Sequence, residues 1–406
     1  MPGDLPRWPH VAFATGKSWK EVAARYSGIV DEQVHNADAK SLNEGGTPGR
    51  TRDEIVARLV ARLHREVRYT GVEFGQASLV PRTPAETLKR KYGDCKDKAA
   101  LLIATLRAAG IPAYMALLNT APGEDTEPTL PGMGFNHAIV YAPGEPDLWI
   151  DATDEYARVG TLPPADQGRL ALVARPQTDQ LTRTPEATSA DNRTLETREF
   201  FLAELGPARV VETSEAWGAI EESYREAYSG PDSKRLRDEL ESYARGTYLA
   251  DKLGSFDHSG AEDFSAPFHL HLEMPHAKRG QTGMESAAVA LMPAALVSRL
   301  PAFLRRDEQD SEESQPPGQA KAGKHRKADM VLLEPYTMEL RYRIVPSPGF
   351  RLQPLPQSGE QHLGPALLSK EFAQGSDGGV TAKLRFDTVK RRFSPEETDA
   401  LTAGVR

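Results

Sequence analysis

The sequence is poor in cysteine, with one residue, Cys95, among 406. A single cysteine excludes an intramolecular disulfide, and this leaves the cellular compartment open because exported bacterial proteins can also lack disulfides. No apolar run approaches the roughly 18 residues of a membrane-spanning helix, and residues 1–25 lack the apolar core of a signal peptide. We therefore expect no membrane span in this chain and leave its localisation unassigned.

An excess of positive charge is also missing. The formal net charge is −8, so nothing general in the electrostatics favours nucleic acid as a partner. The basic cluster at residues 321–327 follows a run of acidic side chains in a polar stretch. We interpret residues 307–328 as a disordered, solvated loop. The sequence gives no indication of the oligomeric state.

Three helix starts are present in the first third of the chain. Residues 51–54, Thr-Arg-Asp-Glu, form a capping box before a segment with one apolar helical face. Thr83 followed by Pro84 predicts a short second helix, because proline suits the first helical position. A third helix is predicted to begin at Cys95 and to end at Gly110, since a glycine followed two residues later by proline terminates helices.

Short apolar runs separated by turn residues come next and predict the strands of one sheet. These strands are residues 114–118, 137–141 and 148–150. We expect a helical lead-in over residues 1–50, a domain over residues 51–175 and a polar linker over residues 176–195. Residues 196–406 contain segments that alternate apolar and polar side chains, which predicts a mainly β, sandwich-like domain.

The neighbours of Cys95 are charged: Asp94, Lys96, Asp97 and Lys98. A lone cysteine is usually a small buried hydrophobe, but these neighbours are unusual for a core position. We therefore expect the thiol to meet water or a cleft. In the first turn of a helix, unsatisfied N–H groups and the helix dipole favour thiolate over thiol. The position therefore suits a nucleophile.

A cysteine nucleophile needs a base to accept and return its proton, and the base needs a third group to orient it. His137 opens one predicted strand, and Asp151 follows the next one. Two adjacent antiparallel strands can present these side chains next to each other, with the Cys95 helix packed on the sheet. Each residue alone also has an ordinary interpretation, since His137 could be a surface histidine and Asp151 a turn residue.

A second histidine pattern occurs later in the chain. His269, His271 and Glu273 alternate with apolar residues, and a His-x-His pair can bind zinc. An exposed polar strand face opposite a core face produces the same pattern, and no nearby cysteine or histidine motif completes four ligands. We therefore predict no metal site and no cofactor.

Several stretches of this sequence resemble a known family. The segments YGDCKDKAALLIATLRAAGIPA (92–113), NHAIVY (136–141) and LWIDAT (148–153) are similar to the transglutaminase-like cysteine hydrolase superfamily. They resemble in particular the bacterial members in which a GDCKDKA motif begins the nucleophile helix. Residues 67–99 and 364–397 also resemble parts of that group. Larger members usually carry an export signal and a β-rich domain of the DUF3857 type before the catalytic one, and we interpret residues 1–50 as the tail of such a domain.

The resemblance implies an α+β fold, with a papain-like, transglutaminase-like catalytic domain followed by a mainly β domain. It implies that Cys95 is the nucleophile, that His137 is the general base and acid, and that Asp151 orients the histidine. The backbone N–H of Cys95 is the expected oxyanion donor, with Tyr69 and Gln76 as side-chain candidates. The family also favours a periplasmic or exported location.

We therefore expect a thiol acyl-transfer enzyme that acts on amide bonds of a peptide or protein substrate through a thioester. Hydrolysis is favoured over amine transfer, because water needs no second binding site. The alternative is a non-catalytic transglutaminase-like module that binds peptide or cell-envelope polymer, with the β-rich domain as its interaction surface.

Overall fold

The computed structural model describes residues 11–35, 50–71, 79–121, 125–230, 232–305, 326–376 and 378–405. The chain divides into two compact units, unit 1 (Met1–Glu186) and unit 2 (Ala187–Arg406). Most of the loop predicted at residues 307–328 lies outside the described residues. Within the described part of the chain, no helix is long and apolar enough to cross a membrane.

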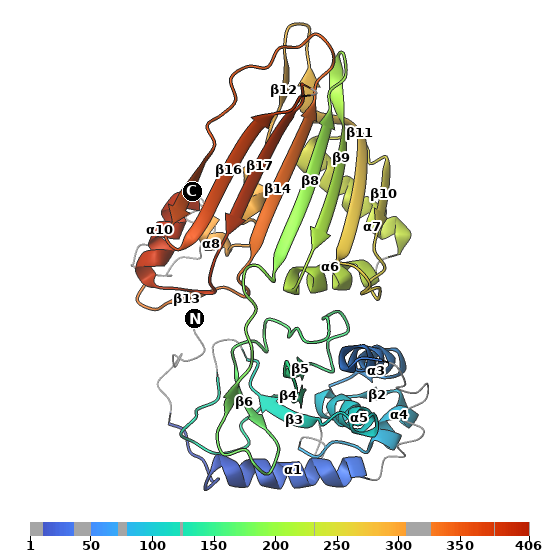
Figure 1. The fold of residues 1–406 in the computed structure, drawn as a ribbon, viewed down its shortest axis with the longest axis vertical. Coiled ribbons are helices and arrows are strands. Elements are labelled where there is room, and N and C mark those ends of the chain that lie inside the picture. Colours follow the sequence, from blue (N-terminus) through green and yellow to red (C-terminus); the bar gives the residue numbers. More distant parts are fainter. Residues whose placement is uncertain are drawn as a thin grey trace, which may run out of the picture. The chain divides into compact units, whose positions relative to one another are not determined.

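Three helices of unit 1 begin where the sequence predicts them. The helices of this unit include α1 (Trp19–His35), α3 (Arg52–Glu66), α4 (Pro84–Arg90) and α5 (Cys95–Ala108) (Figure 1). Thr51 and Glu54 form the predicted capping box of α3, and the Thr83 side chain accepts an N–H at the start of α4. Helix α5 ends just before Gly110, whose φ of +79° lies in the left-handed region that suits glycine.

A sheet forms the other layer of unit 1. Within the described residues its order is β5-β4-β3-β6-β7, with antiparallel pairing throughout. The strands are β3 (Tyr114–Leu118), β4 (His137–Ala142), β5 (Leu148–Ile150), β6 (Leu170–Val173) and β7 (Thr182–Arg183). The first three confirm the predicted strands. A short parallel pair of β1 (Arg68–Tyr69) and β2 (Tyr92–Gly93) holds the segment before α5 beside the segment that follows α3.

Helix α5 is the centre of unit 1. Its side chains from Cys95 to Leu106 are all buried, because strands β3 and β4 and helices α1, α3 and α4 pack around it. The apolar side chains of these elements form one core. A smaller core on the opposite face of the sheet contains Tyr141, Trp149 and Leu162. The sheet is therefore buried on both faces, which leaves little freedom to the strands that pack against α5.

One large sheet dominates unit 2. Within the described residues it has nine strands, in the order β10-β11-β9-β8-β14-β17-β16-β15, with β12 paired to β11. Its neighbouring strands are antiparallel except for β8 and β14, which are parallel. The strands are β8 (Arg193–Phe201), β9 (Gly206–Ala216), β10 (Ser255–His258), β11 (Phe268–Thr282), β12 (Ala287–Val289), β14 (Thr337–Val345), β15 (Gly359–Leu363), β16 (Ala366–Gln374) and β17 (Val380–Asp387). A separate short pair joins β13 (Met330–Val331) to β18 (Arg392–Phe393).

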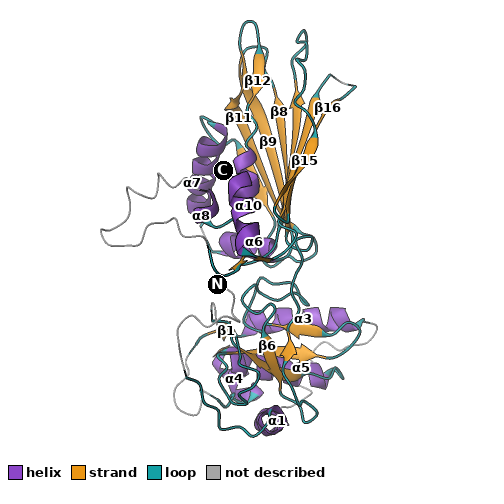
Figure 2. Ribbon diagram, turned by 90° about the vertical axis from the view of Figure 1, so that its left-hand side faces the viewer, coloured by secondary structure: helices purple, strands orange, loops and turns teal. Residues whose placement is uncertain are grey.

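Helices cover one face of this sheet, and this corrects the expectation of a sandwich. They are α6 (Ala219–Ser229), α7 (Ser233–Tyr248), α8 (Ala302–Arg305) and α10 (Pro395–Val405), which lie on the same side of the strands (Figure 2). Alternation with period two shows that one face of a strand is buried. It does not distinguish a second sheet from a layer of helices as the cover. The α+β fold class is confirmed.

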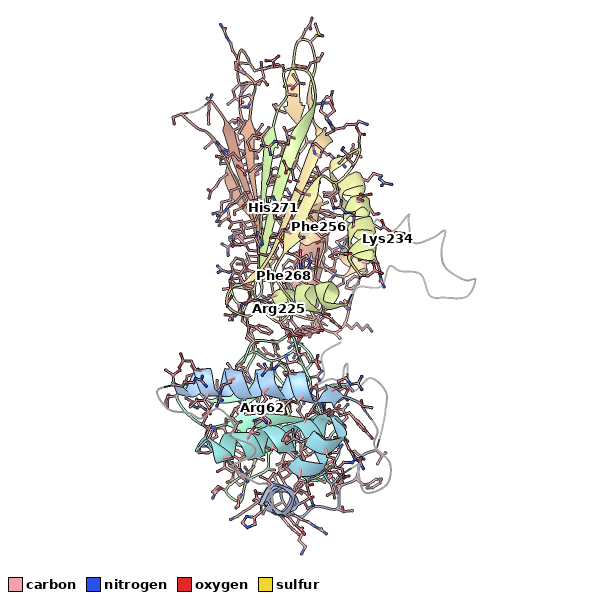
Figure 3. The ribbon with its side chains drawn as sticks, turned by 90° about the vertical axis from the view of Figure 1, so that its right-hand side faces the viewer. Arg62, Arg225, Lys234, Phe256, Phe268 and His271 are labelled. Carbon is pink, nitrogen blue, oxygen red and sulfur yellow. The ribbon has the colours of Figure 1, made fainter. Side chains whose placement is uncertain are left out.

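Strand β11 illustrates the two faces of the sheet. Phe268 and Leu270 are buried in the core under the helices, whereas His269 and His271 lie half-buried on the other face. Arg225 of α6 and Phe268 lie at the same end of the sheet (Figure 3), with the guanidinium carbon 5.8 Å from the ring centre. The histidine pattern of this strand is thus its half-exposed face.

The core of unit 2 contains a buried ion cluster. Arg198 of β8 donates to Glu196 at 2.5 Å and to the Tyr342 hydroxyl at 2.9 Å, and its side chain is 2% exposed. Its Nε lies 3.7 Å from Glu212 of β9, which also accepts a hydrogen bond from Tyr248. Burial, followed by the charge of Glu212, raises the pKa of Glu196 to about 7. Two buried carboxyl groups therefore depend on one guanidinium for a compensating positive charge.

The substitution Arg198→Met should lower the free energy of unfolding by about 3–5 kcal/mol, because it leaves Glu196 and Glu212 buried without their cation. Urea denaturation followed by circular dichroism measures this loss. The matched control is Arg341→Met, since Arg341 is half exposed on β14 and pairs with Glu339 at 2.6 Å. The control should change the free energy by less than about 0.5 kcal/mol. An R198M protein as stable as the wild type would contradict this account of the cluster.

The stability of the protein should also respond to pH through Glu196. Its pKa rises from an ordinary 4.5 to about 7 in the folded state, so between these values the folded protein holds a proton that the unfolded chain releases. Stability from this group therefore falls as the pH rises through that window. Glu196→Gln removes the titration. The urea midpoint of E196Q should therefore rise relative to that of the wild type as the pH increases from about 5 to 7.5. A constant difference between the two proteins would exclude this linkage.

Candidate active site

Helix α5 begins at Cys95 because Asp94 caps it. The Asp94 carboxylate accepts the N–H groups of Lys96 at 2.9 Å and of Asp97 at 3.1 Å. In return the Asp97 carboxylate accepts the Asp94 N–H at 3.4 Å, which completes a capping box. Cys95 is therefore the first residue of the helix, where backbone N–H groups and the helix dipole stabilise negative charge.

The charged residues around Cys95 are buried, and Cys95 itself is 3% exposed. Of the two surroundings expected for the thiol, water or a cleft, exposure to open water is therefore wrong. The Lys96 ammonium lies 3.2 Å from the Asp94 carboxylate, and Arg82 donates to the Asp97 carboxylate at 2.7 Å. Charged side chains can occupy a core when opposite charges and hydrogen bonds lie within reach. Charge in the sequence therefore does not indicate exposure at this position.

His137 and Asp151 meet across the antiparallel pair of β4 and β5. His137 is the first residue of β4, and Asp151 directly follows β5. The Nε2 atom of His137 lies 3.0 Å from Oδ2 of Asp151. The other carboxylate oxygen of Asp151 accepts the N–H and the hydroxyl of Thr153, each at 2.8 Å. Both oxygens of Asp151 are therefore held by donors.

The side chains of Cys95 and His137 are hydrogen bonded, and helix α5 packs on β4. With Nε2 facing Asp151, Nδ1 is the ring nitrogen that remains for the thiol. Burial opposes charge on the ring, but the hydrogen bonds with Asp151 and Cys95 outweigh it, so the pKa of His137 is raised well above its ordinary value. Burial also opposes charge on Asp151, yet the hydrogen bond with His137 lowers the pKa of Asp151. Thiol, imidazole and carboxylate thus lie in one hydrogen-bonded chain.

A second carboxyl group, Asp166, lies beside His137 and was not among the predicted site residues. Its Oδ2 is 3.9 Å from His137 Nε2. Burial, followed by the charge of Asp151, raises the pKa of Asp166 to about 8. His137, Asp151 and Asp166 each offer one ligand-type atom within 4.8 Å of the others. In the sequence Asp166 follows Pro163 and Pro164 and precedes Gly168, a pattern that predicts an ordinary turn. No local signal therefore identifies Asp166 as a site residue.

Lys98, one turn after Cys95 on α5, is buried as well. Its Nζ lies 3.3 Å from Nδ1 of His64 on α3 and 3.9 Å from the Glu155 carboxylate. Burial lowers the pKa of Lys98 to about 8, although Glu155 and Asp151 oppose this shift. Burial and the Lys98 charge lower the pKa of His64 to about 3. The amine therefore links α5 to α3 and to the loop that follows Asp151.

Of the two side-chain oxyanion candidates, the structure describes Tyr69. Tyr69 is 48% exposed on β1 and pairs through its backbone with Gly93 of β2, so it lies on the strand beside the segment that enters α5. Gln76 lies outside the described residues.

Within the described residues the possible metal-ligand group is the one around His137, and His269 and His271 of β11 are not part of it.

Residues 39–152 match the family model of the transglutaminase-like superfamily. This range contains Cys95, His137 and Asp151 and ends before Asp166. No curated protein matches the chain.

A solved structure is similar in fold. It is a protein from Parabacteroides distasonis described as a "putative protease", with a TM-score of 0.51 and 12% sequence identity. The similarity covers 99% of this chain and 61% of that protein, so the chain spans about three fifths of its length. At this identity the similarity concerns the fold, and it agrees with the family match. Residues 39–152 are therefore similar to the transglutaminase-like superfamily, and the solved structure supports the fold.

Proposed function

We propose that this protein is a cysteine peptidase or amidase in which Cys95, His137 and Asp151 form the catalytic triad. The observation that carries the proposal is the hydrogen-bonded chain from Cys95 through His137 to Asp151, with 3.0 Å between the last two. A thiol at a helix start, a base within reach and an orienting carboxylate are the groups that thiol acyl transfer requires. The transglutaminase-like family match supports an enzyme of this kind.

The proposed reaction has two steps. The Cys95 sulfur attacks the carbonyl carbon of a peptide or protein amide, and the thiol proton passes to His137. His137 then donates this proton to the amide nitrogen, the C–N bond breaks, and the acyl group remains as a thioester on Cys95. Water attacks the thioester while His137 accepts its proton and returns it to the sulfur, so the C–S bond breaks and a carboxylic acid is released.

The carbonyl oxygen gains negative charge in both steps and needs hydrogen-bond donors. We assign the first donor to the backbone N–H of Cys95, because it belongs to the N-terminal turn of α5, where N–H groups favour an anion. Tyr69, on the neighbouring strand β1, remains the side-chain candidate for a second donor.

The substitution Cys95→Ser should reduce kcat by at least about a thousandfold, because a hydroxyl replaces the nucleophilic thiolate in the same space. Cleavage of a mixed peptide library, read by mass spectrometry, measures the loss. The control is Cys95→Ala, which should be equally inactive and should unfold within about 1 kcal/mol of the wild type, since it removes only one small side-chain atom. Cleavage retained by C95S would contradict the proposal, and peptide binding without cleavage by the wild type would favour the binding module.

Hydrolysis should dominate over amine transfer. Water reaches any open thioester, whereas an amine nucleophile needs a pocket that binds it and keeps it deprotonated. With a peptide amide and a labelled primary amine supplied together, mass spectrometry should therefore find mainly the free carboxylic acid. Dominant incorporation of the labelled amine would instead identify a cross-linking enzyme.

A further inference from the structure

The carboxyl group of Asp166 is buried against the triad without an evident role. Asp166 lies in the loop between β5 and β6 and is 2% exposed. Its Oδ2 is 3.9 Å from His137 Nε2 and, within the described residues, accepts no hydrogen bond. A buried carboxylate oxygen without a donor is unfavourable, so this group needs a proton or a cation.

The partners of the two neighbouring carboxyl groups decide which of them carries a proton. Asp151 accepts hydrogen bonds from Thr153 at 2.8 Å and lies 3.0 Å from the His137 ring, all of which favour its ionised form. Within the described residues Asp166 has no such donor at Oδ2, and one of its carboxyl oxygens lies within 4.8 Å of one of Asp151. Two carboxyl groups can share a hydrogen bond only when one of them is protonated. The proton therefore belongs on Asp166.

We propose that Asp166 is a positioning residue of this site: as the neutral acid it donates a hydrogen bond to Asp151 and fixes the carboxylate that orients His137. The inference rests on the proposed function, because Asp166 acts through Asp151 and does not touch the substrate. The rise in the pKa of Asp166 to about 8, caused by burial and by Asp151, agrees with a neutral acid at neutral pH.

The backbone around Asp166 is held independently of its side chain. The Asp166 N–H donates to the Pro163 carbonyl at 3.0 Å, and its own carbonyl accepts the Thr184 hydroxyl at 2.5 Å. A change of the side chain alone therefore leaves the anchors of the loop in place.

Several charged groups face the pair of carboxyl groups and affect its ionisation. Asp154, in the loop after β5, acts on Asp166 directly. Lys98 from α5 and His64 from α3 interact with the charge of Asp151. When Asp166 loses its proton at alkaline pH, the added negative charge favours the His137 imidazolium, so the histidine should keep its proton to a higher pH.

Two variants test the proposal through different properties of Asp166. Asp166→Asn keeps a neutral donor but cannot ionise, so it should retain kcat within about threefold at neutral pH, while the alkaline limb of its pH profile moves to lower pH. Asp166→Leu removes the donor, so it should lower kcat about 10- to 100-fold with little change in KM. The control is Asp154→Asn, which removes a nearby charge without altering the contact between His137 and Asp151.

NMR titration of the labelled His137 ring in the Cys95→Ser protein provides a readout that needs no peptidase activity. His137 should lose its proton at lower pH when Asn replaces Asp166. If the wild type cleaves no peptide but this shift is observed, the proposed function fails and the role of Asp166 stands.

The proposal is overturned if folded D166L has the kcat of the wild type, or if D166N leaves the pH profile and the His137 titration unchanged. It is equally overturned if D166N is as inactive as D166L, because a neutral donor would then be insufficient. Activity that is lost with EDTA and restored by Zn²⁺ would show that a cation, and not a proton, occupies the space between the three side chains. Thermal melting of each variant identifies any that do not fold, and if D166L is one of them, D166N decides the outcome.

Discussion

The cap that Asp94 places on α5 is the interaction on which the rest of unit 1 depends. It makes Cys95 the first residue of the helix. A start one residue later would leave Cys95 in the non-helical cap position, outside the first turn whose N–H groups favour an anion. The same helix is buried along its length and forms the centre of the core. The contacts that stabilise unit 1 therefore also hold the thiol against the strand that carries His137.

Buried charge is a recurring feature of both units, and in each it is compensated. Around Cys95, Lys96 pairs with its own cap residue Asp94, and Arg82 pairs with Asp97. In unit 2, one guanidinium serves two carboxyl groups within a core of aromatic side chains. Removing one partner of such a group leaves the others unpaired in a low-dielectric interior. These side chains consequently constrain the geometry of their surroundings, because each must stay within reach of its partner.

The candidate site extends beyond the range that the family model matches. Residues 39–152 contain the hydrogen-bonded chain of Cys95, His137 and Asp151. The loop between β5 and β6 adds Asp166, which lies outside that range and approaches Nε2 of His137, the ring nitrogen that also faces Asp151. A local motif can therefore identify the three polar groups, whereas the complete electrostatic environment of His137 includes a segment with no motif of its own.

The sequence by itself determined the local structure, because caps, apolar periodicity and turn residues act over a few positions. The helix starts after Thr51, after Thr83 and at Cys95, and the strands that present His137 and Asp151, could all be predicted in this way. Tertiary structure alone decided three other features. The charges around Cys95 are buried, and Asp166 approaches His137. In unit 2, helices cover a sheet that has nine strands within the described residues. Each of these depends on which distant segment supplies a partner. The pattern of a single segment contains no information about that partner, because an opposite charge, a helix layer or a second carboxyl group comes from elsewhere in the chain.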